Sequence, residues 1–150
     1  AEGLHTALDT SGQAQWKTFE KVLPYVDLFL YDLKLMDRVE HKIYTGVSNR
    51  LILENLTKIG ESGVPIEIRI PVIPGINDAK ENIVSSARFL TGIKSLTRVE
   101  LLPYHRLGES KYARLGMVYK LSGLEPPGKD HMNEIGKWMR PFGVEVHVGG

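Results

Sequence analysis

The chain has 150 residues, of which 42% are hydrophobic and 25% are charged, and its net charge is +1. These values are typical of one globular domain and give no indication of a nucleic-acid surface. No segment approaches the roughly 20 apolar residues of a membrane-spanning helix, and the first residues lack the pattern of a secretory signal. We therefore expect a cytoplasmic protein with neither a membrane nor a nucleic-acid partner. The absence of cysteine excludes disulfides, thiolate zinc sites and cysteine nucleophiles within the chain.

Short segments rich in Leu, Ile, Val and aromatic residues alternate with segments of helical period. Strands are predicted at residues 4–10, 27–36, 65–73, 98–105 and 144–148. Helices are predicted at residues 13–23, 49–63, 77–92 and about 129–140. Asn49 is the predicted N-cap of the second helix, and Asn77 or Asp78 that of the third. Because parallel neighbours need crossover connections, this alternation predicts an α/β protein with helices packed outside a parallel sheet.

Polar residues stand near the carboxyl ends of the first four predicted strands, where sites in parallel α/β folds gather. These candidates are Asp9, Thr10, Asp32, Lys34, Arg69 and His105. Asp32 and Lys34 are two residues apart on a strand, so they project from the same face as Leu30. Both a solvated ion pair and a ligand site at the strand end would explain this pair.

The other candidates also have structural alternatives. Asp9 and Thr10 would serve either as caps of the next helix or as groups aimed at a ligand. Arg69 would either pair with Glu67 on its own face or place its guanidinium on a carboxylate or peptide carbonyl of a substrate. His105 would be either a structural residue or part of a site, and its position at the end of a strand, before a polar loop, favours a site more than the position of most histidines does. The other four histidines show no metal-ligand spacing, and phosphate-loop and serine-hydrolase motifs are absent.

Four motifs occur in an order and at spacings that resemble one family. They are TALDTSG, DLKLMD followed by HKIYTGVSN, IRIPVIPGIND, and ELLPYHRLGESKY. Together they resemble the activating enzymes of glycyl-radical enzymes, which are radical S-adenosylmethionine (SAM) proteins; the pyruvate formate-lyase type is the nearest match. The resemblance implies a partial (β/α) barrel, of which this chain supplies the last four parallel strands with outer helices and a terminal segment. It also implies that a [4Fe-4S] cluster cleaves SAM reductively and that a glycine of a partner enzyme then loses a hydrogen atom.

The resemblance implies a role for each candidate residue. A monovalent cation beside SAM would be bound by Asp9, Thr10, Asp32 and the carbonyl of Leu30, since such a cation prefers hard oxygen ligands. Lys34 would contact SAM directly. Arg69 and His105 would lie at the barrel mouth, near SAM and the glycine loop of the partner. The electron donor would be a flavodoxin or a ferredoxin.

Two features of the family are absent from the chain, namely the CxxxCxxC cluster loop and the GGE segment that binds the amino end of SAM. In relatives both precede the TALDTSG strand, and the chain also begins without Met. We therefore expect residues 1–150 to be the C-terminal part of such a protein and to be inactive alone. The partner would be pyruvate formate-lyase, an anaerobic ribonucleotide reductase or another glycyl-radical enzyme.

A barrel without its first strands leaves residues 4–10 as an unpaired edge, so we expect oligomerisation through that edge. Two alternative functions stay open. In one, Lys34 is the Schiff-base nucleophile of a (β/α)8 aldolase, although Asp32 beside it opposes the neutral amine that this chemistry needs. In the other, the chain is a non-catalytic half-barrel that docks onto a partner.

Overall fold

The computed structural model describes residues 3–106, 114–116, 118–119 and 121–149. Its strands are β1 (Ala7–Thr10), β2 (Leu28–Asp32), β3 (Ile66–Val72), β4 (Leu96–Pro103) and β5 (Val146–Val148). Its helices are α1 (Trp16–Val22), α2 (Arg38–Thr45), α3 (Arg50–Glu61), α4 (Lys80–Leu90) and α6 (Lys129–Met139). Two 3₁₀ turns, Leu23–Tyr25 and Arg140–Phe142, follow α1 and α6.

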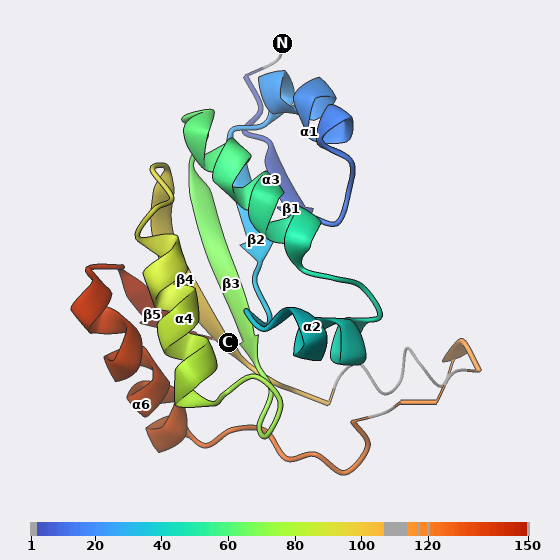
Figure 1. Cartoon of the computed structure of the whole chain (residues 1–150), viewed down its shortest axis with the longest axis vertical. Helices are drawn as coiled ribbons and strands as arrows, with labels where there is room; N and C mark the ends of the chain where they lie inside the picture. The colour runs from blue at the N-terminus through green and yellow to red at the C-terminus, as the bar shows by residue number, and fades with distance from the viewer. Residues whose placement is uncertain (1–2, 107–113, 117, 120, 150) are drawn as a thin grey trace.

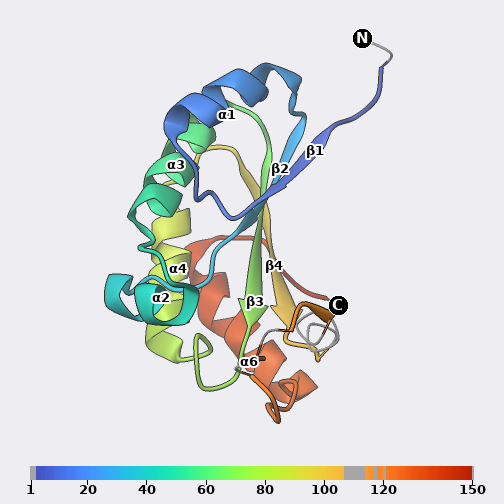
Figure 2. The same ribbon diagram turned by 90° about the vertical axis from the view of Figure 1, so that its right-hand side faces the viewer.

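The strands form one five-stranded parallel sheet in the order β1-β2-β3-β4-β5 (Figure 1). This confirms the predicted α/β class, because every strand returns to the sheet through a crossover. Figure 2 shows α1, α2, α3 and α4 on one side of the sheet. None of the helices in the described ranges is long and apolar enough to cross a membrane.

The two faces of the sheet differ in their side chains. Along β3, Ile66, Ile68 and Ile70 are buried beneath the helices, while Glu67 and Arg69 on the other face are only partly buried. β2 shows the same alternation. A parallel sheet covered on both faces has nearly continuous apolar strands, so this alternation indicates a sheet that is covered on one face.

The hydrophobic core lies between the helices and the covered face of the sheet. Its fully buried helical residues include Leu56 and Ile59 of α3, Ile83 and Leu90 of α4, and Ile135 and Met139 of α6. Burying each such side chain stabilises the fold by about 1.5–3 kcal/mol. This layer fixes the positions of the strands and therefore of the polar residues at their carboxyl ends.

Helix α2 was not predicted from the sequence. It begins after Asp37, whose carboxylate accepts hydrogen bonds from the backbone N–H groups of Val39 and Glu40, each at 2.8 Å. It ends at Gly46, which has a φ of +83°. Other predicted boundaries were too wide, since β2 ends at Asp32 and α1 begins only at Trp16.

The predicted N-cap of α3 is confirmed, whereas the predicted N-cap of α4 is wrong. Asn49 occupies the N-cap position of α3, but its side chain makes no bond to the first turn of the helix. The N-cap of α4 is Ala79 rather than Asn77 or Asp78. Asn49 and Asn77 instead direct their amides to the loop that follows β2. These asparagines therefore connect elements that are distant in the sequence.

Candidate functional site

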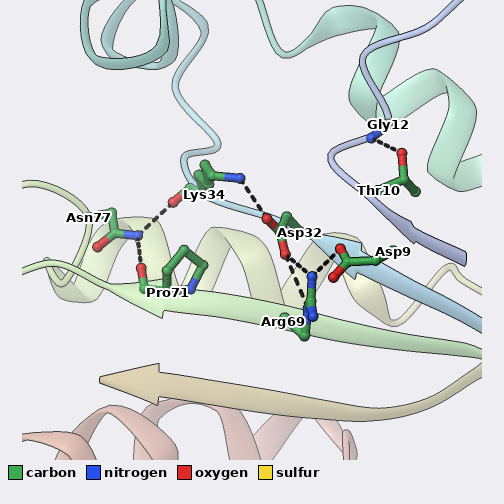
Figure 3. Close-up of polar contacts among 8 residues, drawn as sticks. All are labelled: Asp9, Thr10, Gly12, Asp32, Lys34, Arg69, Pro71 and Asn77. Atoms are coloured by element: carbon green, nitrogen blue, oxygen red, sulfur yellow. Dashed lines mark hydrogen bonds and ion pairs between the residues drawn. The ribbon is translucent and has the colours of Figure 1, made fainter. Parts of the chain in front are cut away.

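An ion-pair cluster joins three neighbouring strands near their carboxyl ends (Figure 3). Asp32 of β2 lies directly opposite Arg69 of β3 in the sheet register. The Arg69 guanidinium donates to Oδ1 of Asp32 from Nη2 at 3.0 Å and from Nε at 3.2 Å. Oδ2 of Asp32 accepts a hydrogen bond from Nζ of Lys34 at 3.0 Å. Both oxygens of this one carboxylate are therefore paired with cations.

Asp9 of β1 completes the cluster. It lies opposite Leu30 in the register, and its carboxylate accepts a hydrogen bond from Nη2 of Arg69. Arg69 thus bridges two carboxylates that belong to different strands. The Asp9 side chain is 62% exposed, whereas that of Arg69 is 21% exposed, so Asp9 is the outer and more replaceable member of the bridge.

The charge of Arg69 is secured by its neighbours. Burial lowers the pKa of Arg69, but its hydrogen bonds to Asp9 and Asp32 and the charges of both carboxylates outweigh burial, so the pKa is raised overall. The guanidinium therefore stays protonated. Partial exposure limits the contribution of such pairs to stability to about 1 kcal/mol or less. The cluster has two cations and two anions, which are the complementary groups needed for a zwitterionic ligand or for a small cation with its counter-ion.

Thr10 and Leu30 lie close to the cluster in sequence but differ in orientation. The Thr10 hydroxyl accepts a hydrogen bond from the backbone N–H of Gly12 at 3.0 Å, at the exit of β1 (Figure 3). Gly12 has a φ of +74°, and a Cβ at this position would lie 1.7 Å from the Tyr31 hydroxyl. Leu30 shares the partly buried face with Asp32. Thr10 therefore shapes the turn, and Leu30 lies on the site's face of the sheet.

The structure does not join His105 to the cluster. His105 follows β4 and is exposed, and within the described residues no hydrogen bond or ion pair connects it with Arg69. The alternative pairing of Arg69 with Glu67 is wrong, because Glu67 pairs with Arg98 at 2.9 Å. Sequence spacing alone cannot predict the partner of Arg69, because the side chains on neighbouring strands decide which charged groups form ion pairs.

Asn77 was missed as a site residue. Its side-chain amide donates to the backbone carbonyl of Lys34 at 3.1 Å and to that of Pro71 at 2.6 Å (Figure 3). Asn77 is only 1% exposed. A buried asparagine needs partners for its amide, so the asparagine of the PGIND loop that follows β3 was the available signal.

A mostly apolar hollow of about 590 Å³ adjoins the cluster through Lys34, and its lining includes Ile43, Tyr44 and Ile73. Within the described residues, no group of three or more His, Cys, Asp or Glu side chains could bind a metal ion. A cation at Asp9 and Asp32 would therefore need further oxygen ligands besides these two carboxylates.

The ion pair of Lys34 with Asp32 disfavours the Schiff-base alternative. In this pair the Lys34 side chain takes part as a charged ammonium group, whereas a Schiff-base nucleophile must be a neutral amine.

Comparison with known proteins identifies the family. No protein-family model matches the chain. The chain is 38% identical, over its full length and 50% of the relative, to trans-4-hydroxy-L-proline dehydratase activating enzyme of Clostridioides difficile. It is 40% identical to (2S)-3-sulfopropanediol dehydratase activating enzyme of Klebsiella oxytoca, over 99% of the chain and 49% of the relative. A crystal structure of a domain of pyruvate-formate lyase-activating enzyme from Bacteroides vulgatus superposes with a TM-score of 0.81 at 31% identity, covering 99% of this chain and 83% of that one.

The chain belongs to the glycyl-radical enzyme activating enzymes. This confirms the resemblance found in the four sequence motifs, and it places the chain among the radical SAM proteins. The chain spans about half the length of the curated activating enzymes that it matches. The family is thus established for the chain and the fold for its described residues, whereas the activity belongs to a longer polypeptide in these relatives.

Proposed function

We propose that the chain is the C-terminal part of an enzyme that cleaves SAM reductively at a [4Fe-4S] cluster and thereby generates a glycyl radical on a partner enzyme. The observation that carries this proposal is the convergence of Asp9, Asp32, Lys34 and Arg69 on the partly buried face of the sheet. Family membership supports the reaction class. When bound, SAM and a reduced cluster supply radical chemistry that no side chain provides.

The side chains of the cluster fit the methionine part of SAM. This part carries a carboxylate and an ammonium group, and the site offers two cations and two carboxylates. Lys34 and Arg69 would bind and orient the carboxylate, because ammonium and guanidinium groups make strong charge-assisted hydrogen bonds. His105 would lie at the barrel mouth, near the bound SAM and the incoming glycine loop.

A monovalent cation would be bound by Asp9, Thr10, Asp32 and the Leu30 carbonyl. The two carboxylates are a suitable donor set, because such a cation prefers hard oxygens. In the structure, however, the guanidinium of Arg69 bridges the same two carboxylates. We therefore expect the cation and Arg69 to compete, so that cation binding frees Arg69 for the ligand.

The residues of the chain do not fit an iron–sulfur cluster, because the 150 residues contain no cysteine. The thiolate ligands would come from a segment outside the chain. This is consistent with the match to only half of the relatives' length. Residues 1–150 alone would therefore be catalytically inactive.

The partner would be a glycyl-radical enzyme that presents a glycine loop to the open end of the barrel, with a flavodoxin or ferredoxin as the electron donor. The two relatives are named after different dehydratases, yet their identities to this chain are 38% and 40%. Sequence identity therefore supports a glycyl-radical enzyme as the partner but does not favour one particular glycyl-radical enzyme. The uncovered β1 edge would pair with the missing strands or with a second copy of the chain.

A fusion protein tests the proposal. Residues 1–150 are joined to the part of the Clostridioides difficile relative that lies outside the match, and the fusion is reconstituted anaerobically with iron and sulfide. We expect SAM-dependent release of 5′-deoxyadenosine and, with a glycyl-radical enzyme, an electron paramagnetic resonance signal of a glycyl radical. The unaltered relative serves as the positive control. An intact, reduced cluster in a folded fusion that releases no 5′-deoxyadenosine would contradict the proposal.

A further inference from the structure

Residues 34–36 begin two residues after the end of β2 and have left the sheet. The last backbone bond of β2 to its neighbour runs from the N–H of Leu33 to the carbonyl of Arg69 at 3.0 Å. The buried backbone groups beyond this point need other partners. The 34–36 segment also carries Lys34, whose ammonium pairs with Asp32.

Three asparagine side chains supply these partners, and they come from different elements. Asn77 and Asn82 both donate to the carbonyl of Lys34, at 3.1 and 3.4 Å. Asn49 donates to the carbonyls of Leu35 and Met36, at 3.1 and 2.8 Å. Asn82 also accepts a hydrogen bond from the N–H of Met36 at 2.9 Å through its Oδ1.

The asparagines are themselves fixed in orientation. Asn77 accepts from the N–H of Ile73 at 2.7 Å and donates to Pro71 at the end of β3. The amide of Asn82 donates to the backbone carbonyl of Asn77 at 2.8 Å. Asn49 and Asn77 are 3% and 1% exposed. Asn77 and Asn82 therefore each use both the donor and the acceptor of their amides for different backbone partners, which fixes the orientation of these two amides.

We infer that Asn49, Asn77 and Asn82 are positioning residues that hold Lys34 in register with Asp32 and Arg69. A lysine side chain has many rotamers, so its ammonium is well placed only when its backbone is fixed. Loss of Asn82 leaves the N–H of Met36 without this partner, and loss of Asn49 does the same to the carbonyls of Leu35 and Met36. Loss of Asn77 removes the shorter of the two hydrogen bonds to the Lys34 carbonyl. In each case the 34–36 segment must shift to find other partners. The inference rests on the proposed function to the extent that Lys34 contacts SAM, while the positioning of Lys34 itself does not depend on it.

The exit of β1 provides a matched control. There Asn55, which is 1% exposed, donates to the carbonyls of Gly12 and Ala14 at 2.9 and 2.8 Å. Asn55→Ala therefore removes the same kind of amide-to-carbonyl bond from a different loop. It should cost a similar amount of stability and leave the 34–36 segment in place.

The first readout is the ammonium signal of Lys34 in ¹⁵N nuclear magnetic resonance spectra of the 150-residue chain. Hydrogen bonding to Asp32 should protect this signal from exchange with water. We expect Asn77→Ala and Asn82→Ala to abolish the protected signal and Asn55→Ala to keep it. Asn82 is only partly buried, so Asn82→Ala should fold even if Asn77→Ala does not. A Lys34 signal that persists in the folded Asn82→Ala variant would overturn the inference.

The second readout is the affinity of the fusion protein for SAM in a double-mutant cycle. With Lys34 present, Asn77→Ala or Asn82→Ala should weaken binding about tenfold, and in a Lys34→Ala background neither should weaken it further. Additive effects would show that the asparagines act independently of Lys34, and would overturn the inference. A wild-type fusion that binds no SAM would refute the proposed function, while the ammonium signal would still decide whether the asparagines position Lys34.

Discussion

Asp32 and Arg69 face each other across β2 and β3, and Arg69 extends past Asp32 to the carboxylate of Asp9. The guanidinium therefore occupies the position between two carboxylates that a small cation would otherwise take. This arrangement makes Arg69 both a member of the candidate site and a competitor for it.

Arg69→Met should increase the response of the chain to Na⁺ or K⁺. Without the guanidinium, the carboxylates of Asp9 and Asp32 repel each other, and a bound cation relieves that repulsion. The change itself should lower the free energy of unfolding by about 1 kcal/mol or less, because the pairs are partly exposed. We expect the melting temperature of the variant to rise more steeply with NaCl or KCl than that of the wild type. Choline chloride at equal ionic strength is the control, and equal slopes for all three salts would contradict cation binding.

Tyr31 should make the fold sensitive to alkaline pH. Burial raises the pKa of the Tyr31 phenol above its ordinary value of 10.0. Above pH 10 the folded chain therefore keeps a proton that the unfolded chain loses, so the free energy of unfolding decreases as pH rises. Guanidinium chloride titrations at pH 8, 10 and 11 would measure this decrease.

Tyr31→Phe should reduce that alkaline loss. It should also cost about 1–2 kcal/mol at neutral pH, because the Tyr31 hydroxyl donates to the buried carbonyl of Ile52 at 2.6 Å. Tyr25, which is 74% exposed, provides the matched control. An alkaline loss that is the same in Tyr31→Phe as in Tyr25→Phe would exclude Tyr31 as its source.

Gly12→Ala should destabilise the exit of β1 more than the same change elsewhere. Gly12 and Gly63 have similar φ values of +74° and +81°, but only at Gly12 would a Cβ meet another atom, the Tyr31 hydroxyl. Gly63→Ala should lower the free energy of unfolding by about 1 kcal/mol through backbone strain. Gly12→Ala should carry the same strain and a further cost of about 1–3 kcal/mol from overpacking. Equal midpoints in urea for the two variants would show that the turn relaxes freely.

Much of this molecule follows from local pattern, and the exceptions have physical reasons. The alternation of Ile66, Glu67, Ile68 and Arg69 predicts which face each side chain takes, and the structure agrees. The partner of Arg69 was not predictable, because it depends on the register of β1 and β2 against β3. Local pattern therefore gives the face of a charged residue, and the sheet register gives its partner.

The helices show the same division between local and distant causes. Asn49 has the residue type and position of a helix cap, yet distant carbonyls use its amide instead. Helix α2 was missed because it is short and leaves apolar residues such as Val39 and Ile43 exposed, at 66% and 68%, so its pattern is not that of a core helix. Sequence pattern predicts a helix best when one apolar face packs on the core.

The β1 edge should associate in the 150-residue chain. Among the residues that the structure describes, β1 pairs with β2 alone, so its other side is an open sheet edge. We expect a concentration-dependent dimer by sedimentation equilibrium, and we expect Ala7→Lys to weaken it, because a charge on an edge strand opposes pairing. Ala7 is exposed, so the substitution should not disturb folding. A strictly monomeric wild-type chain across the concentration range would contradict this expectation.

The most direct test of the site is calorimetric titration of SAM into the reconstituted fusion protein and its variants. Asp32→Ala and Lys34→Ala should each weaken SAM binding about tenfold or more, since each removes a charged partner from the cluster. Glu67→Ala is the matched control, because Glu67 lies on the same face of β3 but pairs with Arg98 outside the cluster; its affinity should equal that of the wild type. Unchanged affinity in both Asp32→Ala and Lys34→Ala would contradict a SAM site at the carboxyl ends of these strands.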